Sequence, residues 1–168
     1  MADISSLSDK QLANLENNYF AKGVETGDLY SLAEVRIEKL RRMPTTLDTV
    51  AVARTIVGLS KASDDNLTTY GELWKHLNPG QPWKGNATQQ LVTNALARVL
   101  AYCVTHAMPI ITVLVVRTGE RRLSELAIQN IFREAQGLGV QTGPDADAFV
   151  FAQRTASIEL ASFPSTES

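Results

Sequence analysis

The chain has few of the residues that build reactive or cross-linked sites. Its 168 residues include one cysteine and two histidines. A single cysteine excludes an internal disulfide framework and suits a reducing compartment. Because no cluster of cysteines or acids joins His76 or His106 at ligand spacing, a zinc site is not expected. We predict neither a metal nor another cofactor.

Long apolar segments are also missing. The longest apolar run is PIITVLVV, residues 109–116, and a membrane-spanning helix needs about 18 residues or more. The first ten residues, MADISSLSDK, are polar and acidic, unlike a signal peptide. We therefore expect a soluble, cytoplasmic protein.

Charge is nearly balanced overall but unevenly distributed. The net charge is −2, which argues weakly against nucleic-acid binding. Between Thr68 and Arg122, however, six basic residues accompany two acidic ones, so that segment carries +4 and the remainder −6. This asymmetry is either chance variation or the electrostatic footprint of a polyanionic partner.

Helical patterns dominate the first third of the chain. Ser8 and Gln11 match a capping box, which opens a helix interrupted by glycines at 23 and 27. Further helices fit residues 28–42 and 46–61, and residues 60–66 form a polar connection. The predicted organisation is an N-terminal helical extension over 1–62, a second domain over 63–162 and a frayed tail over 163–168.

The middle of the chain predicts a different order of elements. Thr69 and Glu72 form a second capping box, which opens a short helix that ends before the turn at 78–80. A long helix capped by Thr88 then fits residues 88–106. The β-branched run 110–116 predicts a strand, with short partner strands at 66–68 and 121–123. Helices beginning at Ser124 and at Asp145 or Asp147 complete the chain. This pattern predicts a mainly α fold with a small β-sheet, built as a winged helix-turn-helix-like core with a helical N-terminal extension.

The stretch TTYGELWKHL, the long helix with Ala95 and Arg98, and the segment MPIITVLVV also carry a family resemblance. Together they resemble the winged-helix DNA-binding domain of alkyltransferase-like and methylated-DNA cysteine methyltransferase proteins. Those proteins read approximately T-Y-G-x-L-A, then a helix containing an arginine, then P-C-H-R-V-V. The resemblance covers residues 67–117, about a third of the chain. It implies a fold and, less directly, DNA binding.

The catalytic motif of that family is absent. Where the family has Pro-Cys-His-Arg, this chain has Pro109-Ile110-Ile111-Thr112. Cys103 lies upstream, inside the predicted long helix, where a free cysteine is commonly buried and inert. The thiol and His106 three residues later could begin a nucleophile pair, but a structural role is favoured for both. We predict that the protein is not an enzyme.

The predicted fold assigns residues 86–98 to a recognition helix and residues 117–122 to a basic wing. Asparagine and glutamine can read base edges, whereas arginines on a wing meet phosphates. The exposed helix face would comprise Asn86, Thr88, Gln89, Gln90, Thr93 and Asn94. The predicted nucleic-acid-binding residues are Lys84, Asn86, Gln89, Gln90, Asn94, Arg98, Arg117, Arg121 and Arg122. The competing interpretation is an ordinary solvated helix face and turn.

Two functions follow from this pattern. The first is a non-enzymatic module that binds nucleic acid, with double-stranded DNA as the candidate partner. The alternative is a protein-interaction protein, such as a small inhibitor or adaptor, on the same scaffold. The N-terminal helices, or Trp83 between Pro82 and Lys84, would then contact the partner. A second copy of the chain is also a candidate partner.

Overall fold

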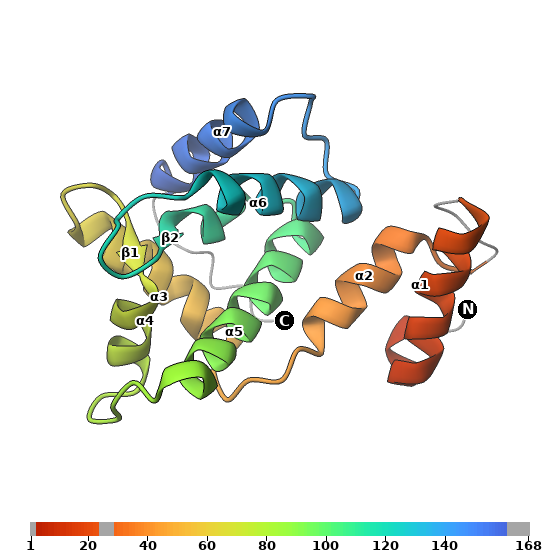
Figure 1. Ribbon diagram of the computed structural model, residues 1–168, viewed down its shortest axis with the longest axis horizontal. Helices are drawn as coiled ribbons and strands as arrows, with labels where there is room; N and C mark the ends of the chain where they lie inside the picture. Colours follow the sequence, from red (N-terminus) through yellow and green to blue (C-terminus); the bar gives the residue numbers. More distant parts are fainter. Residues whose placement is uncertain (1–2, 24–28, 161–168) are drawn as a thin grey trace.

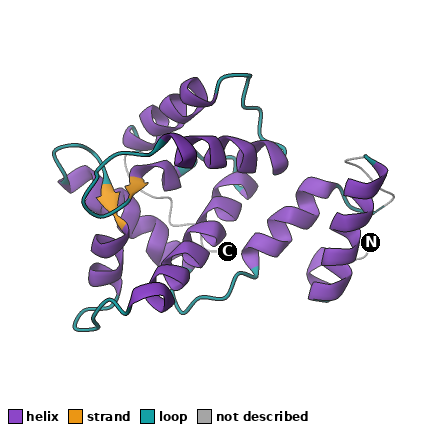
Figure 2. Ribbon diagram, in the orientation of Figure 1, coloured by secondary structure: helices purple, strands orange, loops and turns teal. Residues whose placement is uncertain are grey.

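The architecture is a bundle of helices around one long central helix, with a minimal pair of strands at one edge (Figures 1 and 2). The computed structural model describes residues 3–23 and 29–160. Within these ranges the elements are η1 (Ile4–Ser6), α1 (Asp9–Lys22), α2 (Leu32–Arg41), α3 (Thr49–Ala62), β1 (Thr68–Thr69), α4 (Tyr70–Leu77), α5 (Gly85–Thr105), η2 (Ile111–Leu114), β2 (Val115–Val116), α6 (Glu125–Gly137) and α7 (Ala146–Ile158). The prediction of a mainly α fold with a small β-sheet is confirmed. In the part of the chain that the structure describes, no helix combines the length and apolar character needed to cross a bilayer.

The main core forms around α5. This helix packs against α2, α3, α4 and η2, and its inward side chains include Val92, Val99 and Cys103, each no more than 1% exposed. Apolar residues recur at helical spacing on two adjoining stripes of this segment, which is why it is buried over most of its circumference. Helices α6 and α7 pack on each other, and α7 also packs on η2 and α3.

A second, smaller core joins α1 to the beginning of α2. It contains Leu12, Tyr19, Tyr30, Leu32 and Val35. The Tyr19 hydroxyl donates a hydrogen bond to the Tyr30 carbonyl. Figure 1 places α1 at one end of the molecule, and its contacts run through α2, which in turn packs on α5 and α6. The N-terminal helices are therefore attached to the main bundle chiefly through α2.

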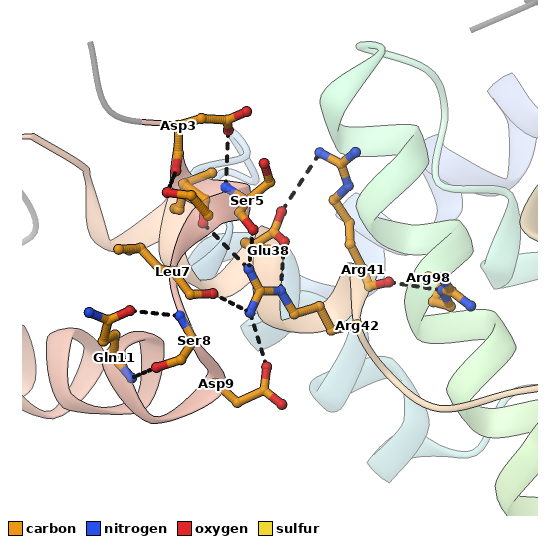
Figure 3. A network of polar contacts seen from close by, with 12 residues as sticks. Asp3, Ser5, Leu7, Ser8, Asp9, Gln11, Glu38, Arg41, Arg42 and Arg98 are labelled. Atoms are coloured by element: carbon orange, nitrogen blue, oxygen red, sulfur yellow. Dashed lines mark hydrogen bonds and ion pairs between the residues drawn. The ribbon is translucent and has the colours of Figure 1, made fainter.

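Arg42, the C-cap of α2, ties the start of the chain to this attachment (Figure 3). Its Nε donates to Glu38 at 2.7 Å, and its Nη1 donates to the Leu7 carbonyl at 2.7 Å and to Asp9 at 3.0 Å. The Glu38 bond is the main reason that the pKa of Arg42 is raised. One guanidinium thus satisfies groups at the beginning of α1 and at the end of α2.

Helix α3 belongs to the main core. Its residues Val52, Ala53, Ile56 and Val57 join the same buried cluster as α5, although the sequence assigned residues 46–61 to the N-terminal extension. The predicted boundary at residue 62 thus lies between helices that share one core. The division into two domains stays a prediction.

The predicted strand over 110–116 is wrong for most of its length. Residues Ile111–Leu114 form a 3-10 turn, and only Val115 and Val116 are in a strand. The turn buries Ile111, Val113 and Leu114 together against α3, α5 and α7. Packing on three helices therefore overrides the β preference of this run, as tertiary context commonly does.

The sheet also differs from a wing. β1 and β2 pair in parallel, with Thr68 opposite Val115 and Thr69 opposite Val116, whereas a wing is an antiparallel hairpin. The expected strand at 121–123 is not formed. Arg121 has a φ of 50°, a left-handed conformation that an extended strand cannot contain.

Most predicted helix ends lie close to the observed ones. Ser8, Ser124 and Asp145 cap α1, α6 and α7 with their side chains, as expected. Thr88 does not cap α5, which begins three residues earlier at Gly85. The Thr88 hydroxyl instead accepts a hydrogen bond from the Lys84 backbone N–H at 2.9 Å. The predicted break at residue 27, the predicted helix start at 28 and the predicted tail 163–168 lie outside the described residues.

Candidate nucleic-acid interface

The first turns of α5 are held in place by the segment that precedes them. The indole N–H of Trp74 donates to the Gln81 carbonyl at 3.1 Å, which fixes the connection between α4 and α5. Gly85 then enters α5 with a φ of 58°, a conformation that glycine adopts without strain. Trp83 lies just before this entry and remains 39% exposed. The chain geometry thus presents a large aromatic ring beside the start of the helix.

Trp83 is part of the wall of a pocket of about 560 Å³. The pocket lies where α4, α5 and the loop after β2 meet. Its lining residues are Tyr70, Trp83, Gln89, Arg117 and Thr118. An amide, a hydroxyl and a phenol can form hydrogen bonds, and they belong to Gln89, Thr118 and Tyr70. Arg117 is cationic, and Trp83 and Tyr70 are aromatic. This combination suits a ligand that has both a planar ring and a negative charge, such as the base and the phosphate of a nucleic acid.

Tyr70 and Thr118 complete the pocket, and neither is among the predicted nucleic-acid-binding residues. The Gly71 backbone N–H donates to the Thr118 hydroxyl at 3.3 Å. A Cβ atom at position 71 would lie 3.1 Å from that oxygen, which is closer than an ordinary contact. The absence of a side chain at Gly71 therefore lets the Thr118 hydroxyl approach the backbone. Burial raises the pKa of Tyr70, an effect that the positive charge of Arg117 partly offsets. Tyr70 is therefore a neutral phenol near neutral pH, able to donate a hydrogen bond. The Tyr-Gly pair in the stretch TTYGELWKHL is a signal that could have indicated this position.

The structure brings some of the predicted residues together. Gln89 and Arg117 share the pocket with Trp83. Lys84, Asn86 and Gln90 are exposed on the same end of α5. Arg122 is exposed and, with Arg117, lines a neighbouring pocket of about 200 Å³ beside α6. These six residues are exposed, and the Gln90 amide also donates to Asn94 at 2.8 Å.

Two positions expected on the exposed helix face are buried. Thr88 is 3% exposed and Asn94 is 4% exposed. The Asn94 amide donates to the Pro44 carbonyl at 2.7 Å and accepts a bond from Gln90 at 2.8 Å. Its role is to join α5 to the chain before α3. The prediction that Thr88 and Asn94 lie on the exposed face is wrong. Asn94 is held against the segment at Pro44, and the Thr88 hydroxyl is turned back to the Lys84 backbone N–H.

Arg98 lies elsewhere on α5. Its Nε donates to the Arg41 carbonyl at 2.9 Å, and the side chain lines a pocket with Arg41 and Tyr102. Neither Arg98 nor Arg41 lines the Trp83 pocket. The structure therefore does not bring Arg98 together with the other predicted binding residues.

Arg121 is engaged by the protein itself. Its guanidinium contacts Asp65 at 2.7 Å and Glu72 at 2.9 Å, and donates to the Leu67 carbonyl at 3.0 Å. Hydrogen bonds from Arg121, and next from Ser63, hold the pKa of Asp65 well below its usual range. This cluster fastens the loop after β2 to the loop before β1. Arg121 thus positions the loop that carries Arg117 and Arg122.

The candidate metal ligands and the single cysteine do not gather into a site in the described residues. These residues contain no group of three or more His, Cys, Asp or Glu side chains that could hold a metal ion. Cys103 is 0% exposed, and burial raises the pKa of its thiol to about 11. The thiolate that acts as a nucleophile is therefore disfavoured.

No protein-family model, curated protein or solved structure matches the chain.

Proposed function

We propose that this protein is a non-enzymatic nucleic-acid-binding protein that holds double-stranded DNA against the first half of α5. The observation that carries the proposal is the pocket in which Trp83, Gln89 and Arg117 converge. Lys84, Asn86 and Gln90 at the start of α5 and Arg122 in the loop after β2 are also exposed.

In this proposal α4 and α5 serve as the two helices of a helix-turn-helix unit. The loop over 117–122 takes the place of the antiparallel wing, because it brings Arg117 into the same pocket as Gln89 of α5 without a hairpin. Lys84, Arg117 and Arg122 would meet phosphate oxygens, whereas Asn86, Gln89 and Gln90 would reach base edges. Trp83 would pack its exposed ring against the sugar or an accessible base.

Fluorescence anisotropy with labelled duplex DNA over a salt series tests the proposal. Removal of one phosphate-binding charge should lower the slope of log affinity against log salt by about 0.9. We therefore expect the double variant Arg117→Ala/Arg122→Ala to bind more weakly, with a slope smaller by about 2. Arg121 is left intact, since its removal would displace the loop as well as delete a charge.

The matched control is Arg54→Ala, which removes a positive charge from an exposed position on α3. It should leave both the affinity and the slope almost unchanged. An absence of duplex binding at low salt would contradict the proposal, as would an equal decrease of affinity in the control and the double variant.

Exposed apolar side chains favour the alternative function, a protein-interaction protein. Phe20 is 79% exposed and Leu29 is 68% exposed, and both belong to the N-terminal helical region. Large exposed apolar groups often anchor protein partners. If this surface joins two copies of the chain, light scattering should detect a dimer that Phe20→Ser converts to a monomer. If the wild type and Phe20→Ser both have the mass of a monomer, the homodimer is excluded. The partner would then have to be a different protein.

A further inference from the structure

A second polar pocket lies on α5 away from the proposed DNA surface. It forms where the end of α2, the first residue of α3 and the last turns of α5 meet. Its volume is about 220 Å³, and its lining residues are Arg41, Thr49, Arg98, Tyr102, Thr105 and His106. None of these residues lines the Trp83 pocket.

The geometry of the helix separates the two pockets. Gln89 and Arg98 are nine residues apart on α5. At about 100° and 1.5 Å per residue, they lie on opposite faces and about 13 Å apart along the axis. A ligand seated against Gln89 therefore does not reach Arg98 by contact across the helix surface.

The Arg98 side chain is placed by a backbone contact, and both arginines of this pocket keep donors available. The Arg98 Nε bonds to the Arg41 carbonyl at 2.9 Å (Figure 3), and its Nη groups have no hydrogen-bond partner in the described parts of the chain. The Arg41 Nη1 lies 3.9 Å from Glu38, and its side chain is 60% exposed. Because the Glu38 carboxylate is bonded more closely to Arg42, at 2.7 Å, it holds Arg41 only weakly.

The chemistry of the lining groups is that of an anion site. They supply two guanidiniums, one imidazole and the hydroxyls of Thr49 and Thr105, and they include no carboxylate. Guanidinium groups bind phosphate through paired N–H donors. The end of α5 opposes an anion with about half a negative charge, but two full positive charges outweigh it. Tyr102 and His106 form one wall, with ring centroids 4.1 Å apart.

We propose that this pocket binds a phosphate dianion, either inorganic phosphate or the terminal phosphate of a small monoester. Its volume is about 220 Å³. It is smaller than the roughly 300 Å³ at which pockets for drug-sized ligands begin. The pocket therefore fits a phosphate group with a short substituent. The inference stands apart from the proposed DNA binding and does not require it.

Titration of the full chain with inorganic phosphate, followed by amide shifts in ¹H–¹⁵N spectra, tests the inference. Ionic strength is held constant with chloride. Saturable shifts are expected at Thr49, Tyr102, Thr105 and His106. Glycerol phosphate in a parallel titration distinguishes the two sources, because the tighter of the two ligands identifies whether a free phosphate or a monoester is preferred.

Variants of the two arginines connect the shifts to the pocket. Arg41→Gln and Arg98→Gln should each raise the Kd for phosphate by about tenfold, the effect expected for one charged hydrogen-bonding partner. Arg54→Gln, outside the pocket on α3, should leave the Kd unchanged. If Arg98→Gln unfolds because its bond to Arg41 is gone, the exposed Arg41 decides the test alone.

Three results would overturn the inference. One is shifts that do not saturate or that chloride reproduces, and another is an unchanged Kd in Arg41→Gln. The third is a duplex oligonucleotide that shifts these amides while phosphate and glycerol phosphate do not. That last result would assign the pocket to a polymer backbone.

Discussion

Two asparagines in the first half of α5 differ in how far their side chains are exposed to solvent. Asn94 is 4% exposed and bonds to the Pro44 carbonyl, whereas Asn86 is exposed in the first turn of the helix. Asn94→Ala removes the hydrogen bond from the buried amide to the Pro44 carbonyl, so we expect it to lower the free energy of unfolding by about 0.5–1.5 kcal/mol. Asn86→Ala should change it by less than about 0.5 kcal/mol. Urea denaturation measures both values.

The same pair separates stability from the proposed DNA contact. Asn86→Ala should weaken duplex binding, and Asn94→Ala should leave the affinity of the folded fraction almost unchanged. Equal decreases of stability in the two variants would mean that the buried position of Asn94 is wrong.

Asp65 makes the stability of the fold depend on pH. Its pKa is lowered chiefly by hydrogen bonds from Arg121, and an unfolded aspartate has a pKa of about 3.9. The unfolded chain therefore binds a proton at this carboxylate more readily than the folded chain does. The Arg121 contact stabilises the fold fully at neutral pH, and this stabilisation decreases progressively as the pH falls below about 4. The stability difference between the wild type and Asp65→Asn should therefore be present at pH 7 and shrink in acid. Asp64→Asn, at an exposed neighbouring position, serves as the control in pH-dependent urea denaturation.

At the scale of elements, α1 depends on a small core of its own. Leu12 is 1% exposed and contacts the cluster shared with α2. A buried Leu→Ala substitution costs about 2–5 kcal/mol, which is large for a cluster of five buried residues. We expect Leu12→Ala to release α1 while α5 stays folded. Hydrogen exchange should then show that protection decreases only in α1.

A matched substitution in the main core gives the opposite pattern. Val99 is 0% exposed on α5, so Val99→Ala should lower protection across the main bundle. A uniform decrease of protection in Leu12→Ala would show that α1 and the main bundle unfold as one unit.

Sequence patterns predicted helices better than strands for a physical reason. A helix is largely defined by local signals, such as the Ser8 and Thr69 caps and the apolar spacing of α5. A strand needs a partner far along the chain, and Ile111–Leu114 found packing against helices instead. The site was predictable in part for the same reason. Local polarity identified Gln89 and Arg117, but the pairing of Arg121 with Asp65 joins segments 56 residues apart.

For the molecule as a whole, Cys103 reports on the integrity of the core. It is 0% exposed, and burial raises its pKa to about 11. We expect a thiol reagent at pH 8 to react only after α5 opens, so the modification rate should rise with urea in parallel with global unfolding. Rapid modification of the native protein would indicate that α5 opens locally. His106→Ala, three residues away at the end of the helix, should not change the native rate if the thiol acts alone.

The pairing of β1 with β2 sets the order in which the protein can assemble. Thr68 and Val115 are 47 positions apart in the chain, so their pairing must await closure of a loop that contains all of α4 and α5. Loop closure costs conformational entropy that the two-residue ladder alone offsets poorly. We expect these two helices to form early and the strand junction late. Since the Trp83 pocket lies beside this junction, ligand binding there should be among the last properties to return during refolding.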